Sequence, residues 1–351
     1  MSIITVTGEI SKNELGITSV HEHLLLDLSN QYRDFDEISK ASYRYQKLSL
    51  ENIHIVKRNP CAIRDNLIID DIDVAIEEVI KFRDAGGDSI VDVTNLGLGR
   101  DVKALYSISR ATGVNLIAGA SYYYHDTHPD NMDDKSVDEI KEEIINDIKY
   151  GVGETGIRAG YIGEVAISPE LHPNEEKVII ASAKAQRETG AGFGIHIFPW
   201  ADKGWPLGVD MLDIALKNGA EPGKVAINHV DVAMGIDPNY IRTIIKKGAL
   251  VEFDNFGHEG YVNRDERQFI PGPFQCDFQR VETIRMLIDE GYIDQIVLGC
   301  DVCSKCFLQK FGGWGYAHLI NNIVPMMYDY DISKEQINKM LVDNPAKLLD
   351  I

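Results

Sequence analysis

The chain has 351 residues, of which 44% are hydrophobic, enough to bury the core of one large α/β domain. Its net charge of −20 disfavours a nucleic-acid partner, which would require a basic face. Five cysteines, an odd number, do not suggest a secreted disulfide framework, and no apolar run approaches membrane-spanning length. The N-terminus has no basic segment followed by an apolar stretch, so we expect no secretion signal, no membrane partner and a cytoplasmic location.

Short apolar runs of the kind buried in parallel sheets recur along the whole chain. We predict eight strands, at or near residues 17–20, 88–94, 115–121, 159–164, 193–197, 225–229, 249–254 and 296–301. Helical periodicity lies between them, as in Asp71–Ala85, where Gly86 stands at the place of a C-terminal cap. Near the end, Ser333–Gln336 has the form of a capping box, and the helix that it starts should end at Asn344–Pro345.

Eight strands alternating with helices predict a (β/α)8 barrel. No linker or low-complexity stretch divides residues 1–351, so we expect a single barrel domain. Two stretches are too long for plain connections, Asp27–Ile69 and Gly257–Gln279. Long loops at a barrel mouth usually shape a pocket, and we expect these two to do so.

Six residues of metal-binding type stand at the ends of five predicted strands: His21, His23, Glu164, His196, His229 and Asp301. The steps from Glu164 to His196 and on to His229 are 32 and 33 residues, the length of one strand-plus-helix unit. Because all strand C-termini of a barrel meet at one mouth, the six side chains should converge there. Alone, a strand histidine is more often a core residue, Asp301 would suit a helix cap, and Glu164 would suit a buried ion pair. Their conjunction favours a metal centre.

Six ligands exceed the three that a catalytic zinc usually takes from protein, so we expect two divalent ions. Zinc is the first choice, with manganese, cobalt and iron as alternatives. His21 and His23, two apart on a strand, should bind one ion together, while His196 and His229 bind the other. Glu164 should bridge the two ions, and Asp301 should bind the first and act as the catalytic proton acceptor. Such a pair of ions activates water for hydrolysis without an organic cofactor.

Several motifs resemble, in family order, the phosphotriesterase family of the amidohydrolase superfamily: Thr18–Leu24, Gly119–Tyr123, Gly160–Glu164, Asn228–Asp231, Leu298–Asp301 and Asn344–Leu349. Lys57–Pro60 and Phe311–Pro325 are similar to its phosphotriesterase-related branch, which includes proteins described as resiniferatoxin-binding. The resemblance implies a binuclear metal hydrolase with the same six ligands. Organophosphate-hydrolysing and lactonase members of the family bridge their metals with a carboxylated lysine. Glu164 stands at that position here, so organophosphates are not the expected substrates.

The resemblance also suggests two substrate-binding residues. Lactonase-like relatives place a tyrosine where Tyr123 ends the third strand, although Tyr122 and Tyr124 leave the register open. Lys305 follows Asp301 by four residues, and the related branch carries a lysine in this loop, which suggests that it binds a substrate anion. A solvated surface lysine is the competing interpretation.

Two further groups of residues have weaker interpretations. Arg264 and Arg267 are weaker candidates for binding the same substrate anion. Cys300, Cys303 and Cys306 have iron–sulfur-like spacing but straddle Asp301, so we expect free thiols near the pocket.

We therefore expect a hydrolase whose metal-bridging hydroxide attacks a small carboxylic ester, such as a lactone with or without a phosphate, or a small N-acyl amide. A phosphoester or phosphotriester hydrolase is an alternative within the same class of enzyme. A binding protein without turnover, on the same fold, is an alternative from another class. The expected partner is a small molecule, anionic if Lys305 contacts it. The sequence does not decide between a monomer and a homodimer.

Overall fold

A sheet of eight parallel strands forms the centre of the computed structural model, which describes residues 2–32, 34–198, 204–232, 237–262 and 272–351. The strands are β3 (Thr18–Glu22), β6 (Ser89–Asp92), β7 (Asn115–Ala120), β8 (Tyr161–Ile167), β9 (Gly192–Ile197), β10 (Val225–Ile227), β11 (Leu250–Phe253) and β14 (Ile296–Leu298). They pair in chain order from β3 to β14. The Asp301 N–H then donates to the His21 carbonyl at 3.0 Å, which joins the last strand to the first. The predicted (β/α)8 barrel is confirmed.

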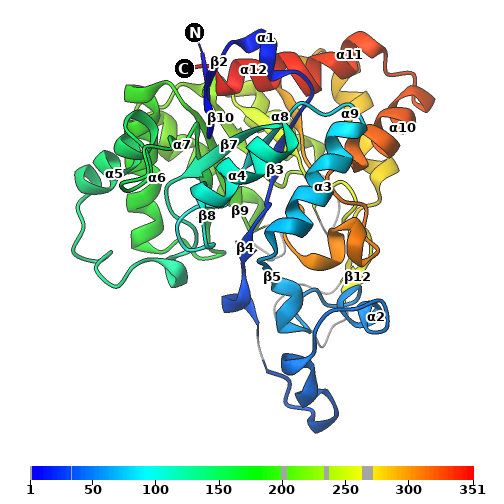
Figure 1. Cartoon of the computed structure of the whole chain (residues 1–351). Helices are drawn as coiled ribbons and strands as arrows, with labels where there is room; N and C mark the ends of the chain where they lie inside the picture. The colour runs from blue at the N-terminus through cyan, green and yellow to red at the C-terminus, as the bar shows by residue number, and fades with distance from the viewer. Residues whose placement is uncertain (1, 33, 199–203, 233–236, 263–271) are drawn as a thin grey trace.

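Helices pack around this barrel (Figure 1). The longer ones are α3 (Ile72–Asp84), α4 (Val102–Thr112), α5 (Val137–Lys149), α6 (Pro173–Thr189), α7 (Gly204–Lys217), α8 (Pro238–Lys246) and α9 (Asp277–Asp289). The helix predicted at 71–85 is confirmed as α3. The Asp71 carboxylate caps its start by accepting the N–H groups of Asp73 and Val74. No helix in the described ranges is long and apolar enough to cross a membrane.

The C-terminal helices do not stop where the sequence suggested. The capping box of Ser333 starts α11 (Lys334–Asn338), as predicted, but helical backbone continues through a wide turn at Lys339–Asp343 into α12 (Asn344–Leu349). In that turn the Asn344 N–H bonds to the Lys339 carbonyl, five residues back. The altered bonding pattern allows Pro345, which has no N–H to donate, to stand in the first turn of α12. The prediction that this pair ends the helix is therefore wrong.

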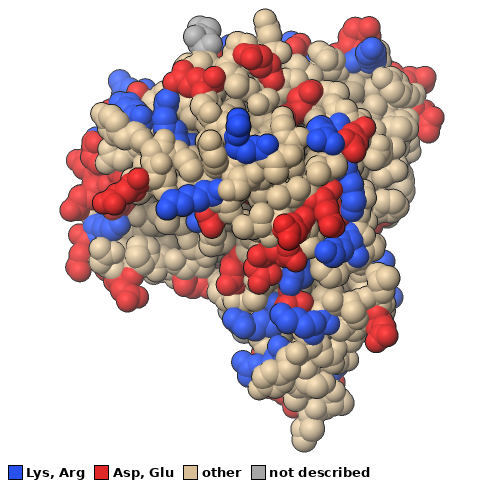
Figure 2. Space-filling model, viewed as in Figure 1, with Lys and Arg blue, Asp and Glu red and all other residues tan. Residues whose placement is uncertain are grey.

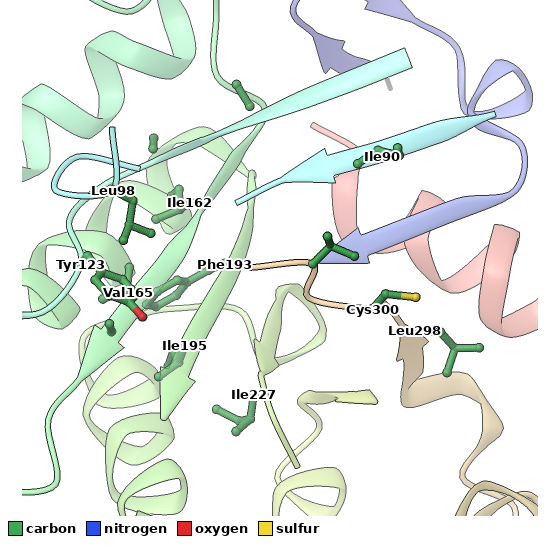
Figure 3. Close-up of a cluster of buried hydrophobic side chains, with 14 of the residues drawn as sticks. Ile90, Leu98, Tyr123, Ile162, Val165, Phe193, Ile195, Ile227, Leu298 and Cys300 are labelled. Atoms are coloured by element: carbon green, nitrogen blue, oxygen red, sulfur yellow. The ribbon is translucent and has the colours of Figure 1, made fainter. Parts of the chain in front are cut away.

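Two apolar clusters make the core. The larger lies between the strands and the surrounding helices, and Figure 3 shows part of it, with Ile162 of β8, Phe193 and Ile195 of β9, and Ile227 of β10. The smaller joins side chains of several barrel strands to the C-terminal helix, and its members include Val20, Val91, Ile117, Tyr161, Val297, Leu348 and Leu349. The C-terminal helix thus covers the end of the barrel where the two termini lie side by side, with the Ile351 N–H bonded to the Ser2 carbonyl at 2.9 Å (Figure 1).

The opposite end carries a lobe made of residues 28–67 (Figure 1). It is bounded by the antiparallel pair β4 (Leu26–Asp27) and β5 (Ile68–Ile69), and it holds the 3-10 helices Ser29–Gln31, Ile38–Tyr45 and Arg64–Leu67 and the short helix α2 (Ile53–Val56). Leu48, Val56 and Ile63 form a small core with Cys306 from the loop after β14. The first long segment predicted from the sequence therefore folds as this lobe.

The remaining elements are short. A hairpin of β1 (Ile3–Thr5) and β2 (Gly8–Ile10) and helix α1 (Lys12–Leu15) precede the barrel, and α10 (Val324–Asp329) precedes α11. The second predicted long segment contains the pair β12 (Tyr261–Val262) and β13 (Gly272–Pro273). It ends earlier than predicted, because α9 already begins at Asp277.

The seam between β14 and β3 requires a glycine at position 299. A Cβ atom there would lie 2.9 Å from the His21 Cβ and 3.0 Å from its carbonyl oxygen. We expect Gly299→Ala to push the two strands apart and to lower the free energy of unfolding by about 1–3 kcal/mol, measured by urea denaturation. Gly223→Ala is the control, because a Cβ there would meet nothing within 4 Å. Equal stability of the two variants would contradict this account of the seam.

Candidate metal centre

The structure brings all six predicted ligands together at the mouth of the barrel, each at most 5% exposed. His21 and His196 lie within β3 and β9, His23 directly follows β3, and His229 and Asp301 lie two and three residues beyond β10 and β14. The Glu164 carboxylate lies among the four histidines, with Oε1 3.3 Å from His23 Nε2 and Oε2 3.5, 3.6 and 3.8 Å from Nε2 of His21, His196 and His229. Asp301 Oδ1 lies 3.4 Å from His23 Nε2.

Glu164 does not end its strand, as the sequence suggested, but lies in the middle of β8. The pairing register of β8 with β9 shifts between Ile162 and Val165. At this shift Gly163 adopts a φ of +143°, a value that residues other than glycine rarely adopt. The Glu164 N–H then donates to the Val93 carbonyl at 3.0 Å. This irregularity places the carboxylate among the four imidazoles.

Each histidine is held through the nitrogen that faces away from Glu164. His21 Nδ1 lies 3.0 Å from Glu252 Oε2 and His229 Nδ1 lies 3.0 Å from Asp254 Oδ1. His23 Nδ1 lies 2.8 Å from Thr94 Oγ1 and His196 Nδ1 lies 3.2 Å from the Tyr124 hydroxyl. Metal-binding histidines are usually oriented in this way.

These orienting residues were not among those predicted from the sequence. Glu252 and Asp254 were visible as two carboxylates, two residues apart, in an apolar strand. Because residues two apart on a strand point to the same side, this spacing is typical of a pair of carboxylates that could both contact the histidines.

The donor set fits divalent metal ions. His21 Nε2 and Glu164 Oε2 are buried and have no hydrogen-bond partner in the described part of the chain. Buried polar atoms are rarely left unpaired, so an ion between them would explain this arrangement. Donor atoms of His21, His23 and Asp301, and again of His21, Glu164 and His229, lie within 4.8 Å of one another. Imidazole and carboxylate donors are those that zinc and similar ions prefer.

The pKa values differ among the buried ligands. Burial opposes charge on His23, but Asp301 and Glu164 outweigh it and raise its pKa to about 9. Burial lowers the pKa of His196 to about 3. Burial opposes charge on Asp301 as well, yet His23 and the neighbouring imidazoles lower its pKa to about 2. A divalent ion that binds here has to displace protons, as is usual for protein metal sites.

Glu22 positions Asp301, a role that the sequence analysis did not assign. Its carboxylate accepts the N–H groups of Cys300 at 2.9 Å and Val302 at 3.1 Å, on either side of Asp301. Asp301 itself has a φ of +46°, which residues other than glycine seldom adopt. Burial raises the pKa of the Glu22 carboxyl to about 7, although the Ser19 hydroxyl, donating at 2.6 Å, opposes this. Glu22, the residue between His21 and His23, thus fixes the loop that carries Asp301.

A cavity of about 320 Å³ opens above the ligands. His23, Glu164, His196 and Asp301 line it on the barrel side. Its walls are largely apolar and include Leu26, Leu67, Leu98, Phe274, Phe307 and Trp314. The lobe, β4 and the loops after β6, β11 and β14 contribute these walls, as expected for long loops at a barrel mouth.

The structure distinguishes among the three tyrosines after β7. The Tyr123 hydroxyl lies 3.4 Å from His196 Nε2, and the residue lines the cavity. Tyr124 reaches the other ring nitrogen of His196, whereas Tyr122 donates to Glu143 instead. Tyr124 lines the cavity as well, but the Tyr123 hydroxyl is the one beside Nε2, the nitrogen of His196 that faces Glu164. The role of Tyr123 in binding substrate stays a prediction.

Lys305 lies in the loop after β14, as predicted, but its ammonium is paired with carboxylates. Its ammonium is 3.0 Å from Asp65 Oδ1 and 3.8 Å from Asp70 Oδ1, and its side chain is 12% exposed. It ties the lobe to the loop after β14, and it is not among the residues that line the cavity. Its role in binding a substrate anion stays a prediction, with the ion pair to Asp65 as its observed contact. The other cationic candidates, Arg264 and Arg267, lie outside the described residues.

The cysteines agree with the expected free thiols. All five are free, and Cys303 lines the cavity next to the ligands.

A (β/α)8 barrel that gathers four histidines and two carboxylates beside a cavity at its mouth has the architecture of a metal-dependent hydrolase. The sequence model of the phosphotriesterase family matches residues 1–349, so the chain belongs to the phosphotriesterase family. The resemblance drawn from the motifs is confirmed, and we class the protein as a hydrolase.

Individual proteins agree with this assignment. An N-acetyltaurine hydrolase of Xenopus tropicalis is 34% identical over 346 residues, covering 98% of this chain and 97% of that protein. A phosphotriesterase-related protein of Nematostella vectensis is 34% identical over 353 residues, with the same coverage of 98% and 97%. The crystal structure of a resiniferatoxin-binding protein from Rhodobacter sphaeroides is similar with a TM-score of 0.92 and 31% identity, covering 99% of this chain and 95% of that chain.

The role of Glu22 can be tested by Glu22→Gln. The amide can accept through only one atom, so one of the two N–H groups beside Asp301 loses its partner. We expect zinc affinity to fall by about 10- to 100-fold, as for other residues that orient metal ligands. Competition with a chromogenic chelator measures it, and Glu14→Gln on the exposed helix α1 serves as the control. Unchanged zinc affinity in Glu22→Gln would refute the positioning role.

Proposed function

We propose that the protein hydrolyses small N-acyl amides at a centre of two divalent ions, and that zinc is the preferred metal. The observation that carries this proposal is the placement of Glu164, whose Oε1 lies beside His23 and whose Oε2 lies beside His196 and His229. His21, expected to share an ion with His23, has its Nε2 3.5 Å from Oε2, so it stands between the two positions. The full-length similarity to relatives named N-acetyltaurine hydrolase supports an amide substrate. N-acetyltaurine is therefore the first substrate to test.

When bound, the two ions would polarise the substrate carbonyl and lower the pKa of a bound water toward neutrality. Four side chains of the chain itself would complete the chemistry. His196 and His229 would hold the ion nearest Tyr123, whose hydroxyl lies 3.4 Å from His196 Nε2. Tyr123 can there donate a hydrogen bond to the substrate carbonyl oxygen. Asp301 lines the cavity beside His23, where it can accept a proton from water.

Proton transfer matters for an amide, because the leaving amine must be protonated as the C–N bond breaks. Asp301 contacts His23 and lines the cavity. Unlike Glu164, it does not lie among the four histidines, so it suits the role of proton carrier. Its backbone is fixed by Glu22 and by the His258 ring, whose Nε2 donates to the Asp301 carbonyl at 2.9 Å. This rigid placement suits a group that has to take up a proton and deliver it.

A hydrolysis screen tests the proposal. Zinc- and manganese-loaded protein is offered N-acetyltaurine and other small N-acyl amides, next to lactones and phosphoesters. We expect the N-acyl amides to give the highest kcat/KM. A preference for lactones or phosphoesters would replace the proposed substrate, and absence of turnover for every class would favour a binding protein on this fold.

The number of ions can be measured by elemental analysis. If Glu164 bridges two ions, metal-loaded wild type should hold about two per chain, and Glu164→Ala should lose most of both. Glu170→Ala, at an exposed position, should retain the wild-type content. Saturation of the wild type at one ion would rule out the two-ion proposal.

The role of Asp301 can be separated from metal binding. Asp301→Asn keeps the shape of the side chain but removes the proton acceptor, so kcat should fall by about 10²–10⁴. Metal content is measured on the same samples, because the loss of rate should exceed the loss of metal. A variant with normal metal content and undiminished kcat would show that another group transfers the proton.

A further inference from the structure

The lobe at the barrel mouth differs in charge from the rest of the molecule. Residues 28–67 contain seven Lys or Arg and five Asp or Glu, whereas the whole chain has 35 and 55. The lobe is therefore slightly positive in a protein of net charge −20. Figure 2 shows basic side chains gathered where the lobe meets the barrel. A local positive region at a mouth can attract an anion despite an acidic surface elsewhere.

Most cations of the lobe are already paired with neighbours on its surface. Lys40, Arg44 and Lys47 lie 3.2, 3.0 and 2.6 Å from carboxylate oxygens of Glu37, Asp34 and Asp65. Arg64 donates to the Ser29 hydroxyl at 3.2 Å. These side chains have partners and do not line the cavity.

Lys57 and Arg58 differ from them in both respects. Both line the cavity, and they are the lysine and arginine that do so among the described residues. Neither forms an ion pair with a carboxylate in the described parts of the chain. Both are exposed, so they stand at the cavity entrance. Two adjacent cations without a carboxylate partner beside a cavity form a place for an anion.

The turn that carries them is fixed. Lys57 caps the C-terminal end of α2, where its N–H bonds to the Ile53 carbonyl at 3.0 Å, and the Arg58 N–H bonds to the Ile55 carbonyl at 3.1 Å. The next two residues are held as well, since the Asn59 N–H bonds to the Ile55 carbonyl at 3.2 Å and the buried Asn66 amide donates to the Pro60 carbonyl at 2.8 Å. Backbone positions held in this way need little ordering when a ligand binds.

We propose that Lys57 and Arg58 bind an anionic group, a sulfonate or carboxylate, at the end of the substrate remote from the bond that is cleaved. The inference rests on the proposed function, because it places the scissile amide at His23, Glu164 and Asp301 on the barrel side of the same cavity. The apolar walls between these ends suit a short aliphatic spacer. The substrate class is thus an N-acyl derivative of a small amino acid or aminosulfonate.

Binding of stable ketones tests this separately from turnover. In 4-oxopentane-1-sulfonate a methylene replaces the amide nitrogen of N-acetyltaurine, 5-oxohexanoate carries a carboxylate instead, and 5-hydroxypentan-2-one is the neutral counterpart. Titration calorimetry measures their affinity for zinc-loaded protein. The variant is Lys57→Gln with Arg58→Gln, and the control with equal charge change is Lys40→Gln with Arg44→Gln.

We expect the wild type to bind one or both anionic ketones more tightly than the neutral one. The Lys57 and Arg58 double variant should bind them about ten- to thirtyfold more weakly, since exposed charge pairs contribute modestly. Its affinity for the neutral ketone, and all affinities of the control, should stay within about twofold of the wild type. Equal loss for charged and neutral ketones, unchanged binding of the anions, or no binding of either anion by the wild type would overturn the proposal.

The outcomes also separate this inference from the proposed function. Anion binding that depends on Lys57 and Arg58, in a protein that hydrolyses no N-acyl amide, would support the anion site and overturn the amide hydrolase. Hydrolysis of N-acetyltaurine with the same kcat/KM in the wild type and the double variant would support the amide hydrolase and overturn the anion site.

Discussion

The carboxylate of Glu164 lies 2% exposed, with imidazole nitrogens of four histidines between 3.3 and 3.8 Å from its oxygens. A buried charge is costly unless cations or hydrogen-bond donors surround it, and Oε2 has no donor in the described chain. The fold meets this constraint by bringing strand ends that are far apart in sequence to one point. The irregular pairing at Gly163 and the residues behind each imidazole, such as Glu252 and Asp254, all hold that arrangement.

A second set of buried polar contacts connects the two sides of the centre. Arg280, fully buried, donates to Asp231 at 3.1 Å, to Asp277 at 2.8 Å and to the His258 carbonyl at 3.2 Å. Asp231 lies two residues after a predicted ligand, and the His258 ring bonds to the Asp301 carbonyl. The guanidinium therefore joins the loops after β10 and β11, and the His258 ring joins the latter to the loop after β14. Networks of this kind preserve geometry as long as each member keeps its partner.

Features set by the local sequence pattern could be predicted, whereas features set by contacts between residues far apart in the chain could not. The strands, the cap of α3 and the convergence of the six ligands could be predicted, because periodicity and barrel geometry determine them. The place of Glu164 within β8 could not, since the register shift depends on the neighbouring strand. Lys305 shows the same limit, because its ion-pair partner Asp65 lies 240 residues away in the sequence and no local pattern indicates it. Net charge hides a similar difference, because it averages an acidic barrel with a slightly basic lobe.

The central claim, that Glu164 joins two metal ions, is tested most directly by anomalous diffraction from crystals of the zinc-loaded protein. The account predicts two peaks about 3.5–4 Å apart, one beside His21 and His23 and the other beside His196 and His229, with one Glu164 oxygen on each. A single fully occupied peak, or two ions of which only one contacts Glu164, would contradict it.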